Sequence, residues 1–249
     1  MTSGCVVMKR AFAASLLLLV AAVVQAETPS GVEDKAAETL RKMSAFLSGT
    51  QRFSLEAEET LDAPSGSGLR AELSNVRKIT VERPNHFVAS ARGDTLNRAA
   101  WYDGHTLAIL NTLSKVYVTL DAPATIDGVL DKVAQDLGVV IPLSDFVYSD
   151  PYESLMDGVV AGKYLGIHEA GGTPCHHLSF SQGDIAWQIW IDAGAQPLPR
   201  KFVVDYGEAD GSSRYSATFR RWDLNPRTAP ALFKFTPPPG AQALDLQTH

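Results

Sequence analysis

Cysteine is almost absent from this sequence. Of the 249 residues only Cys5 and Cys175 are cysteines, and Cys5 lies in an N-terminal segment that we predict to be removed. The remaining chain then has a single thiol and no internal disulfide. This excludes the small extracellular scaffolds that depend on disulfides. The fold must instead be stabilised by a hydrophobic core.

Long hydrophobic runs are also absent, apart from one at the N-terminus. Two basic residues precede the apolar run 11–24, and the small residues around Ala26 suit signal peptidase. We predict a cleavable signal peptide over residues 1–26, a periplasmic location, and a single domain over residues 27–249. No later stretch approaches the roughly 20 apolar residues of a membrane-crossing helix, so we expect no transmembrane segment in the mature chain.

Basic residues are outnumbered by acidic ones. The sequence has 22 lysines and arginines against 28 aspartates and glutamates, for a formal net charge of −6. Nucleic acids and anionic lipid surfaces attract proteins of the opposite charge balance. We therefore expect no nucleic-acid partner.

Motifs for hydrolysis are missing as well. The sequence contains neither Gly-x-Ser-x-Gly nor His-Glu-x-x-His. A catalytic triad can assemble from distant residues, so this absence lowers the expectation of an enzyme without removing it. We predict a non-enzymatic protein with no cofactor.

One string of the sequence suggests a metal site. On a strand, Cys175 and His177 of the string Cys175-His176-His177 point to one face and His176 to the other. At most two of the three face one ion, whereas a zinc site uses three or four protein ligands. We predict no metal site and interpret the string as half-buried sheet residues.

The segment 171–222 contains the strongest pattern. Apolar or aromatic residues recur at every second position in three runs, with Gly, Asp and Pro between them. This pattern predicts an antiparallel meander of four strands. Trp187 and Trp190 occupy opposite faces of one strand, so each face of the sheet must be covered, at least locally.

Helical periodicity occurs in two places. Apolar residues three to four apart predict amphipathic helices over 32–47 and 124–137. The segment 142–156 is apolar with interruptions and is typical of short helical turns. Further strands are predicted over 53–57, 69–82, 87–91, 98–102, 106–111, 115–120 and 159–168, with a turn over 62–68.

Together these patterns predict an α+β fold. It is a long curved antiparallel sheet, an open half-barrel, with the helices capping its concave side. A sheet of about ten strands tends to curl. A curled sheet under helices can enclose an apolar hollow that would hold a ligand.

Several segments resemble a known family. They are RPNHFVAS (83–90), WYDGHTL (101–107), GVVIPLSDFVYSDPY (138–152), GTPCHHLSF (172–180), DIAWQIWIDAGAQPLPRKFVVDY (184–206) and FKFTPPPGA (233–241). They are similar to DUF2092, a family of predicted periplasmic proteins. The resemblance implies a fold similar to the lipoprotein carriers LolA and LolB and to the regulator RseB. The activity of the family is undefined, so no site residue is carried over.

Two functions follow from the predicted hollow. In the first, the protein binds a lipid or an acylated, lipoprotein-like ligand, with Trp101, Trp187, Trp190 and Ile189 as candidate lining residues and the two long helices as a movable lid. Large aromatics in a sheet are more often core residues. In the second, the fold is a protein-interaction or sensor module resembling RseB, whose partner is a protein of the periplasm or outer membrane.

Overall fold

A computed structural model describes residues 31–138, 141–207 and 213–244. The predicted signal peptide lies outside the described residues. Twelve strands form one sheet in the order β12-β6-β5-β4-β3-β2-β1-β11-β10-β9-β8-β7. Every neighbouring pair is antiparallel except β12 and β6, which run parallel. Since consecutive strands are neighbours almost throughout, the chain builds two meanders that meet where β1 pairs with β11.

The two meanders use different parts of the sequence. The first consists of β1 (Arg52–Gly66), β2 (Leu69–Glu82), β3 (His86–Gly93), β4 (Asn97–Tyr102), β5 (Thr106–Asn111) and β6 (Val116–Asp121). The second consists of β7 (Ala161–Ala170), β8 (Thr173–Gln182), β9 (Ile185–Asp192), β10 (Pro199–Asp205) and β11 (Arg214–Asp223). The short β12 (Gln242–Ala243) completes the edge beside β6.

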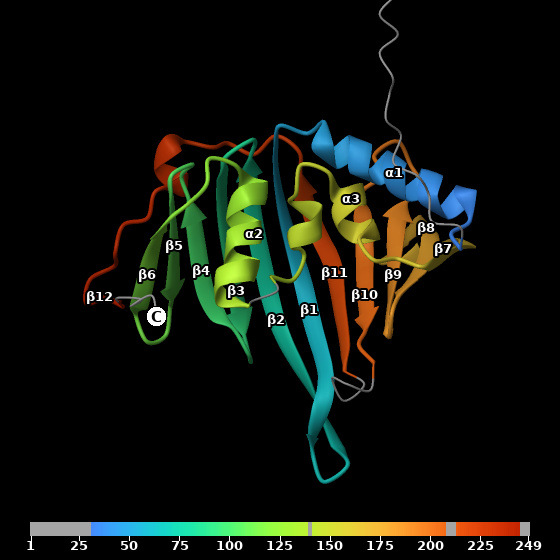
Figure 1. Cartoon of the computed structure of the whole chain (residues 1–249), viewed down its shortest axis with the longest axis horizontal. Coiled ribbons are helices and arrows are strands. Elements are labelled where there is room, and N and C mark those ends of the chain that lie inside the picture. The colour runs from blue at the N-terminus through green and yellow to red at the C-terminus, as the bar shows by residue number, and fades with distance from the viewer. Residues whose placement is uncertain (1–30, 139–140, 208–212, 245–249) are drawn as a thin grey trace, which may run out of the picture.

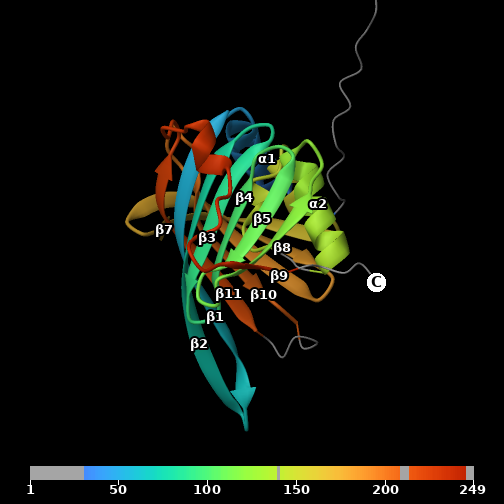
Figure 2. The ribbon, with the colours of Figure 1, turned by 90° about the vertical axis from the view of Figure 1, so that its left-hand side faces the viewer.

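The sheet curves around the helices. Figures 1 and 2 show α1 (Asp34–Ser48), α2 (Ile126–Leu137), the turn η1 (Ser144–Phe146) and α3 (Pro151–Met156) on one side of the sheet, which is its concave side. In Figure 1, α2 lies in front of the first meander and α1 in front of the second. The predicted α+β half-barrel with helices on its concave side is therefore confirmed.

Helix α1 packs directly on the sheet. Its residues Ala36, Leu40, Met43 and Leu47 recur at helical spacing and are fully buried. They belong to the same core as the inward side chains of β8 to β11. Ser44 of α1 also donates a hydrogen bond to the carboxylate of the α3 cap residue Asp150 (3.0 Å). Helix α1 is thus fixed both to the sheet and to α3.

The convex face is covered by the C-terminal segment. The turn η3 (Pro230–Phe233) places the ring of Phe233 5.2 Å from that of His86. Phe235 then packs against Trp101 and Tyr117 at 5.1 and 5.0 Å. This segment covers the side of the first meander that faces away from α2.

The predicted turn over 62–68 is too long. Strand β1 continues to Gly66, and its residue Pro64 is still paired with Arg70 of β2. The turn itself is confined to the tip of a ribbon that extends beyond the rest of the sheet (Figure 1). Proline and glycine indicated a turn, but at the end of a two-stranded ribbon they are tolerated because no third strand needs their backbone groups.

No described helix combines the length and the apolar character needed to cross a bilayer.

Candidate functional site

A cavity of about 330 Å³ lies between α2 and the first meander. Strands β2 to β5 form its floor, α2 forms its roof, and the segment from Ile141 to Val147 closes one side. Its lining residues are predominantly apolar: Arg77, Ile79, Phe87, Ala89, Ser90, Ala91, Leu96, Arg98, Ala99, Ala100, Leu107, Ile109, Val129, Leu130, Val133, Ile141, Pro142, Ser144 and Val147.

The floor of the cavity consists of cross-strand rows. The row closest to the start of β3 is made of large side chains, with Phe87 opposite Tyr102 and Tyr102 opposite Leu107. The next row runs Ile79, Ala89, Ala100, Ile109. The third runs Arg77, Ala91, Arg98, Asn111.

Alanines create the hollow. Because alternate residues of a strand face the same side, Ala89, Ala91 and Ala100 all point toward α2. A methyl group on β3 and β4 cannot reach the helix above, so space remains between the two layers. Ala89 and Ala100 are accordingly only half-buried although a helix lies over them.

Helix α2, which forms the roof, has a capping residue at each end. Thr125 caps the N-terminus by accepting a hydrogen bond from the Gly128 amide (3.1 Å). The C-cap Gly138 has a left-handed conformation (φ 60°). Between them, Val129 and Val133 face the cavity. The helix therefore begins and ends where its apolar face covers the floor.

Polar contacts hold the roof in place. Asp127 of α2 accepts hydrogen bonds from the backbone amide of Ser149 (2.9 Å) and from its hydroxyl, and Tyr148 donates to Asp131 (2.9 Å). Arg83 donates to the carbonyls of Val147 (3.0 Å) and Tyr148 (2.9 Å). Burial lowers the pKa of Arg83. These contacts connect α2 and the neighbouring loop to the end of β2.

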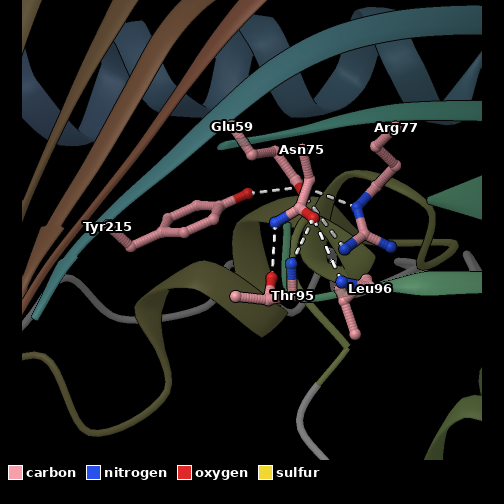
Figure 3. A network of polar contacts seen from close by, with 6 residues as sticks. All are labelled: Glu59, Asn75, Arg77, Thr95, Leu96 and Tyr215. Atoms are coloured by element: carbon pink, nitrogen blue, oxygen red, sulfur yellow. Dashed lines mark hydrogen bonds and ion pairs between the residues drawn. The ribbon is translucent and has the colours of Figure 1, made fainter. Parts of the chain in front are cut away.

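The lining residue Arg77 belongs to a buried group of polar contacts, which Figure 3 shows. Glu59 accepts two hydrogen bonds from Arg77, at 2.5 and 3.2 Å, and one from the hydroxyl of Tyr215 at 2.8 Å. All three side chains are buried. Burial, followed by the charge of Glu59, raises the pKa of Tyr215 well above its ordinary value. Tyr215 therefore stays protonated and donates to the carboxylate.

A second set of hydrogen bonds, made by Asn75 opposite Glu59, positions the turn between β3 and β4. The side-chain oxygen of Asn75 accepts from the amides of Thr95 (3.3 Å) and Leu96 (3.2 Å), and its nitrogen donates to the Thr95 hydroxyl (2.7 Å). Gly93 lies so close to β2 that a Cβ there would stand 2.1 Å from the Ser74 carbonyl oxygen. This close approach holds Leu96 at the cavity wall.

The four residues predicted to line a ligand site lie elsewhere. Trp187 and Ile189 face the concave side of β9 in the second meander, where they are buried in the packed core. Trp190 points to the convex side and stacks on His177 at 3.9 Å. Trp101 also points to the convex side, against Phe235. None of the four lines the cavity beneath α2, and their contact with a ligand stays a prediction.

The lining residues of β3 and β4 were missed at the sequence level. The sequence prediction selected aromatic residues because they bury the largest area, whereas a cavity forms where side chains are small. The available signal was the alternation of Phe87, Ala89 and Ala91, with Ala100 on the next predicted strand. Small side chains at these alternate positions indicate a strand face that leaves space beneath the helix packed over it.

The histidine string behaves as the strand alternation predicts. His176 points to the concave side, where it contacts the Tyr164 hydroxyl (2.9 Å). His177 points to the convex side, with its Nδ1 2.8 Å from Nδ1 of His168. Among the described residues, no group of three or more His, Cys, Asp or Glu side chains is arranged to hold a metal ion.

A family model covers most of the chain. The family DUF2092, described as predicted periplasmic protein, matches residues 36–247. The chain therefore belongs to this family, as the sequence segments predicted. No curated protein matches the sequence.

Three solved structures are similar to this chain at low sequence identity. An uncharacterised conserved protein from Thermus thermophilus has a TM-score of 0.50 and 12% identity, over 84% of this chain and 98% of that chain. LprF from Mycobacterium bovis has a TM-score of 0.45 and 15% identity, over 79% and 96%. A LolA superfamily protein from Nitrosomonas europaea has a TM-score of 0.37 and 10% identity, over 80% and 98%. At these identities a likeness bears on the fold alone.

Proposed function

We propose that this chain is a periplasmic protein that binds a ligand with an apolar chain, a lipid or an acylated molecule, in the cavity beneath α2. The observation that carries the proposal is the cavity itself, with Ala89 and Ala100 in its floor and Val129 and Val133 in its roof. A ligand whose apolar chain enters this space removes the apolar lining from water, which favours binding.

The expected affinity is adequate without any charged contact. Each buried methylene contributes about 0.8 kcal/mol, so about ten methylenes contribute about 8 kcal/mol. This corresponds to a Kd of about 1 μM before the costs of association are subtracted. The family description, predicted periplasmic protein, supports the compartment. In this proposal the protein is a carrier or chaperone for such ligands.

The roles of the two long helices differ from the predicted pair of lids. Helix α1 does not line the cavity and packs on the sheet through residues such as Leu40. Helix α2 contributes Val129, Leu130 and Val133 to the lining. If a helix moves to admit a ligand, the geometry favours α2.

Filling the cavity tests the proposal. Ala100→Phe places a ring in the space beneath α2, and Ala186→Phe, on the convex side of β9, is the matched control. The uncharged apolar fluorophore N-phenyl-1-naphthylamine serves as the probe. We expect the natural protein and the control to bind it, and Ala100→Phe to bind at least about tenfold more weakly.

Two further measurements complete the test. Thermal unfolding establishes that Ala100→Phe is folded, and Ala89→Leu offers a smaller addition in the same row if it is not. Native mass spectrometry of protein isolated from a periplasm should show an additional lipid mass. Equal binding of the probe by the filled and natural proteins, or a consistently empty protein with a defined protein partner, would contradict the proposal and favour an interaction module.

A further inference from the structure

The charged side chains that line the cavity are of one sign. Among its lining residues the only charged side chains are Arg77 and Arg98, and no carboxylate lines it. This contrasts with the whole sequence, whose net charge is −6. The two arginines occupy the same cross-strand row, separated by Ala91. The cavity therefore has an apolar end near Phe87 and Leu107 and a positive end at this row.

The charge of Arg77 is already balanced. Glu59 contacts it through both carboxylate oxygens, and the side chains of Arg77 and Glu59 are 7% and 2% exposed. A buried pair of this kind is neutral as a unit. Arg77 thus contributes a polar wall to the cavity rather than an available charge.

The charge of Arg98 is not balanced in the same way. Arg98 is exposed and belongs to the cavity lining, which places it at the opening. Within the described ranges it forms no ion pair. Its cross-strand neighbours are the uncharged Ala91 and Asn111. A guanidinium at the mouth of an apolar cavity is suited to a carboxylate or phosphate, which it binds through two parallel hydrogen bonds.

The size of the cavity limits the apolar part. Ligand pockets generally measure about 300–1,000 Å³, and this one, at about 330 Å³, is at the lower end. Such a volume suits one chain better than the two or three chains of a phospholipid or a lipoprotein.

We infer that the ligand is a single-chain amphiphile with a negatively charged head group. Its chain lies beneath α2 against Ala89 and Ala100, and its head group meets Arg98 at the opening. This inference rests on the proposed function and names the ligand class for the same cavity. It also gives a role to an arginine that has no carboxylate partner among the residues that the structure describes.

The test compares ligands that share a chain and differ in charge. The probes are palmitate, hexadecyl phosphate, the neutral hexadecanol and the cationic hexadecyltrimethylammonium, each measured by displacement of N-phenyl-1-naphthylamine. We expect the two anions to bind about tenfold or more tightly than hexadecanol, because a charge-assisted hydrogen bond is lost in the alcohol. The cation should bind most weakly. Comparing palmitate with hexadecyl phosphate shows whether a carboxylate or a phosphate is preferred.

A pair of arginine variants locates the effect. Arg98→Gln should remove most of the preference for anions and leave hexadecanol binding unchanged. Arg92→Gln is the matched control, since Arg92 is an exposed arginine one strand away whose side chain belongs to the opposite face. It should leave both affinities unchanged.

The outcomes separate this inference from the proposed function. Equal binding of hexadecanol and palmitate, or equal losses in Arg98→Gln and Arg92→Gln, would overturn the anionic head group while leaving the apolar site intact. If none of the four probes displaces the fluorophore, or the fluorophore itself does not bind, the proposed function fails as well.

Discussion

The two halves of the concave side differ in how they are filled. Under α1, the inward side chains are large, and Phe180 stacks on Trp187 with their rings 4.2 Å apart. Under α2, the corresponding inward positions of β3 and β4 carry Ala89, Ala91 and Ala100. The same curved sheet and the same kind of amphipathic helix therefore give a packed core on one side and a cavity of about 330 Å³ on the other.

This difference shows that sheet curvature alone does not create a cavity. A helix lies on the concave side of each half (Figures 1 and 2), and protein interiors fill the intervening space to high density when side chains allow it. The hollow is the result of small residues at inward positions on two adjacent strands. Variants that change one half and not the other test this conclusion.

Removing the buried contact that joins the two halves should have the largest effect on the free energy of unfolding. Glu59 on β1 contacts Arg77 from the hollow half and Tyr215 from the packed half. Glu59→Ala leaves the Arg77 charge buried without a partner, which should cost about 3–5 kcal/mol in the free energy of unfolding. Urea unfolding measures this loss.

The neighbouring residue provides the control for that variant. Glu58 faces the other side of β1 and pairs with Arg220 in an exposed ion pair. Glu58→Ala should cost no more than about 1 kcal/mol. Similar losses for the two variants would show that the buried network does not join the halves.

Truncating a leucine in each half should give the next largest effect on the free energy of unfolding. Leu40 of α1 is fully buried in the packed half, so Leu40→Ala should cost about 2–5 kcal/mol. Leu130 of α2 is also buried but lines the cavity. Its truncation enlarges a space that is already there, so Leu130→Ala should cost less than Leu40→Ala, about 2 kcal/mol or below. Urea unfolding of both variants tests this, and an equal or larger cost at Leu130 would contradict the distinction between the halves.

Lowering the pH should reduce the stability of the packed half, and this is the smallest of the expected effects. Burial lowers the pKa of His176 and of His177 below the ordinary value of 6.5. His177 Nε2 donates to the side-chain oxygen of Gln188 at 3.0 Å, so its Nδ1 accepts from His168 in the neutral form. Protonation of His177 removes that acceptor.

The direction of the pH effect follows from these shifts. Below about pH 6.5 the unfolded chain binds more protons at these histidines than the folded chain, so stability is present above that pH and declines as the pH falls. Lys201 over Trp190 adds a positive charge to the same cluster. Hydrogen exchange of β7 and β8 should increase between pH 7 and pH 5, and His177→Gln should reduce that increase. An unchanged increase in the variant would exclude His177 as its cause.

Local patterns in the sequence determined the elements of this protein. The period of two residues in 171–222 specifies the four strands β8 to β11, and the helical period in 32–47 and 124–137 specifies α1 and α2. These patterns depend only on neighbours along the chain, so they are readable without a structure. Such patterns also predicted the curved sheet and the side of the sheet on which the helices lie.

Tertiary structure alone decided where the cavity and its charge lie. Whether the space beneath a helix is filled depends on side chains summed across several strands, and register aligns Arg77, Ala91 and Arg98 although each lies on a different strand. Likewise, the contact of Glu59 with Tyr215 joins residues 156 positions apart. Of the tryptophans that suggested a ligand site, Trp187 is buried in the packed core, whereas Trp101 and Trp190 pack on the convex side. Whether the alanine positions leave a space is decided only by the side chains of the helix that packs over them.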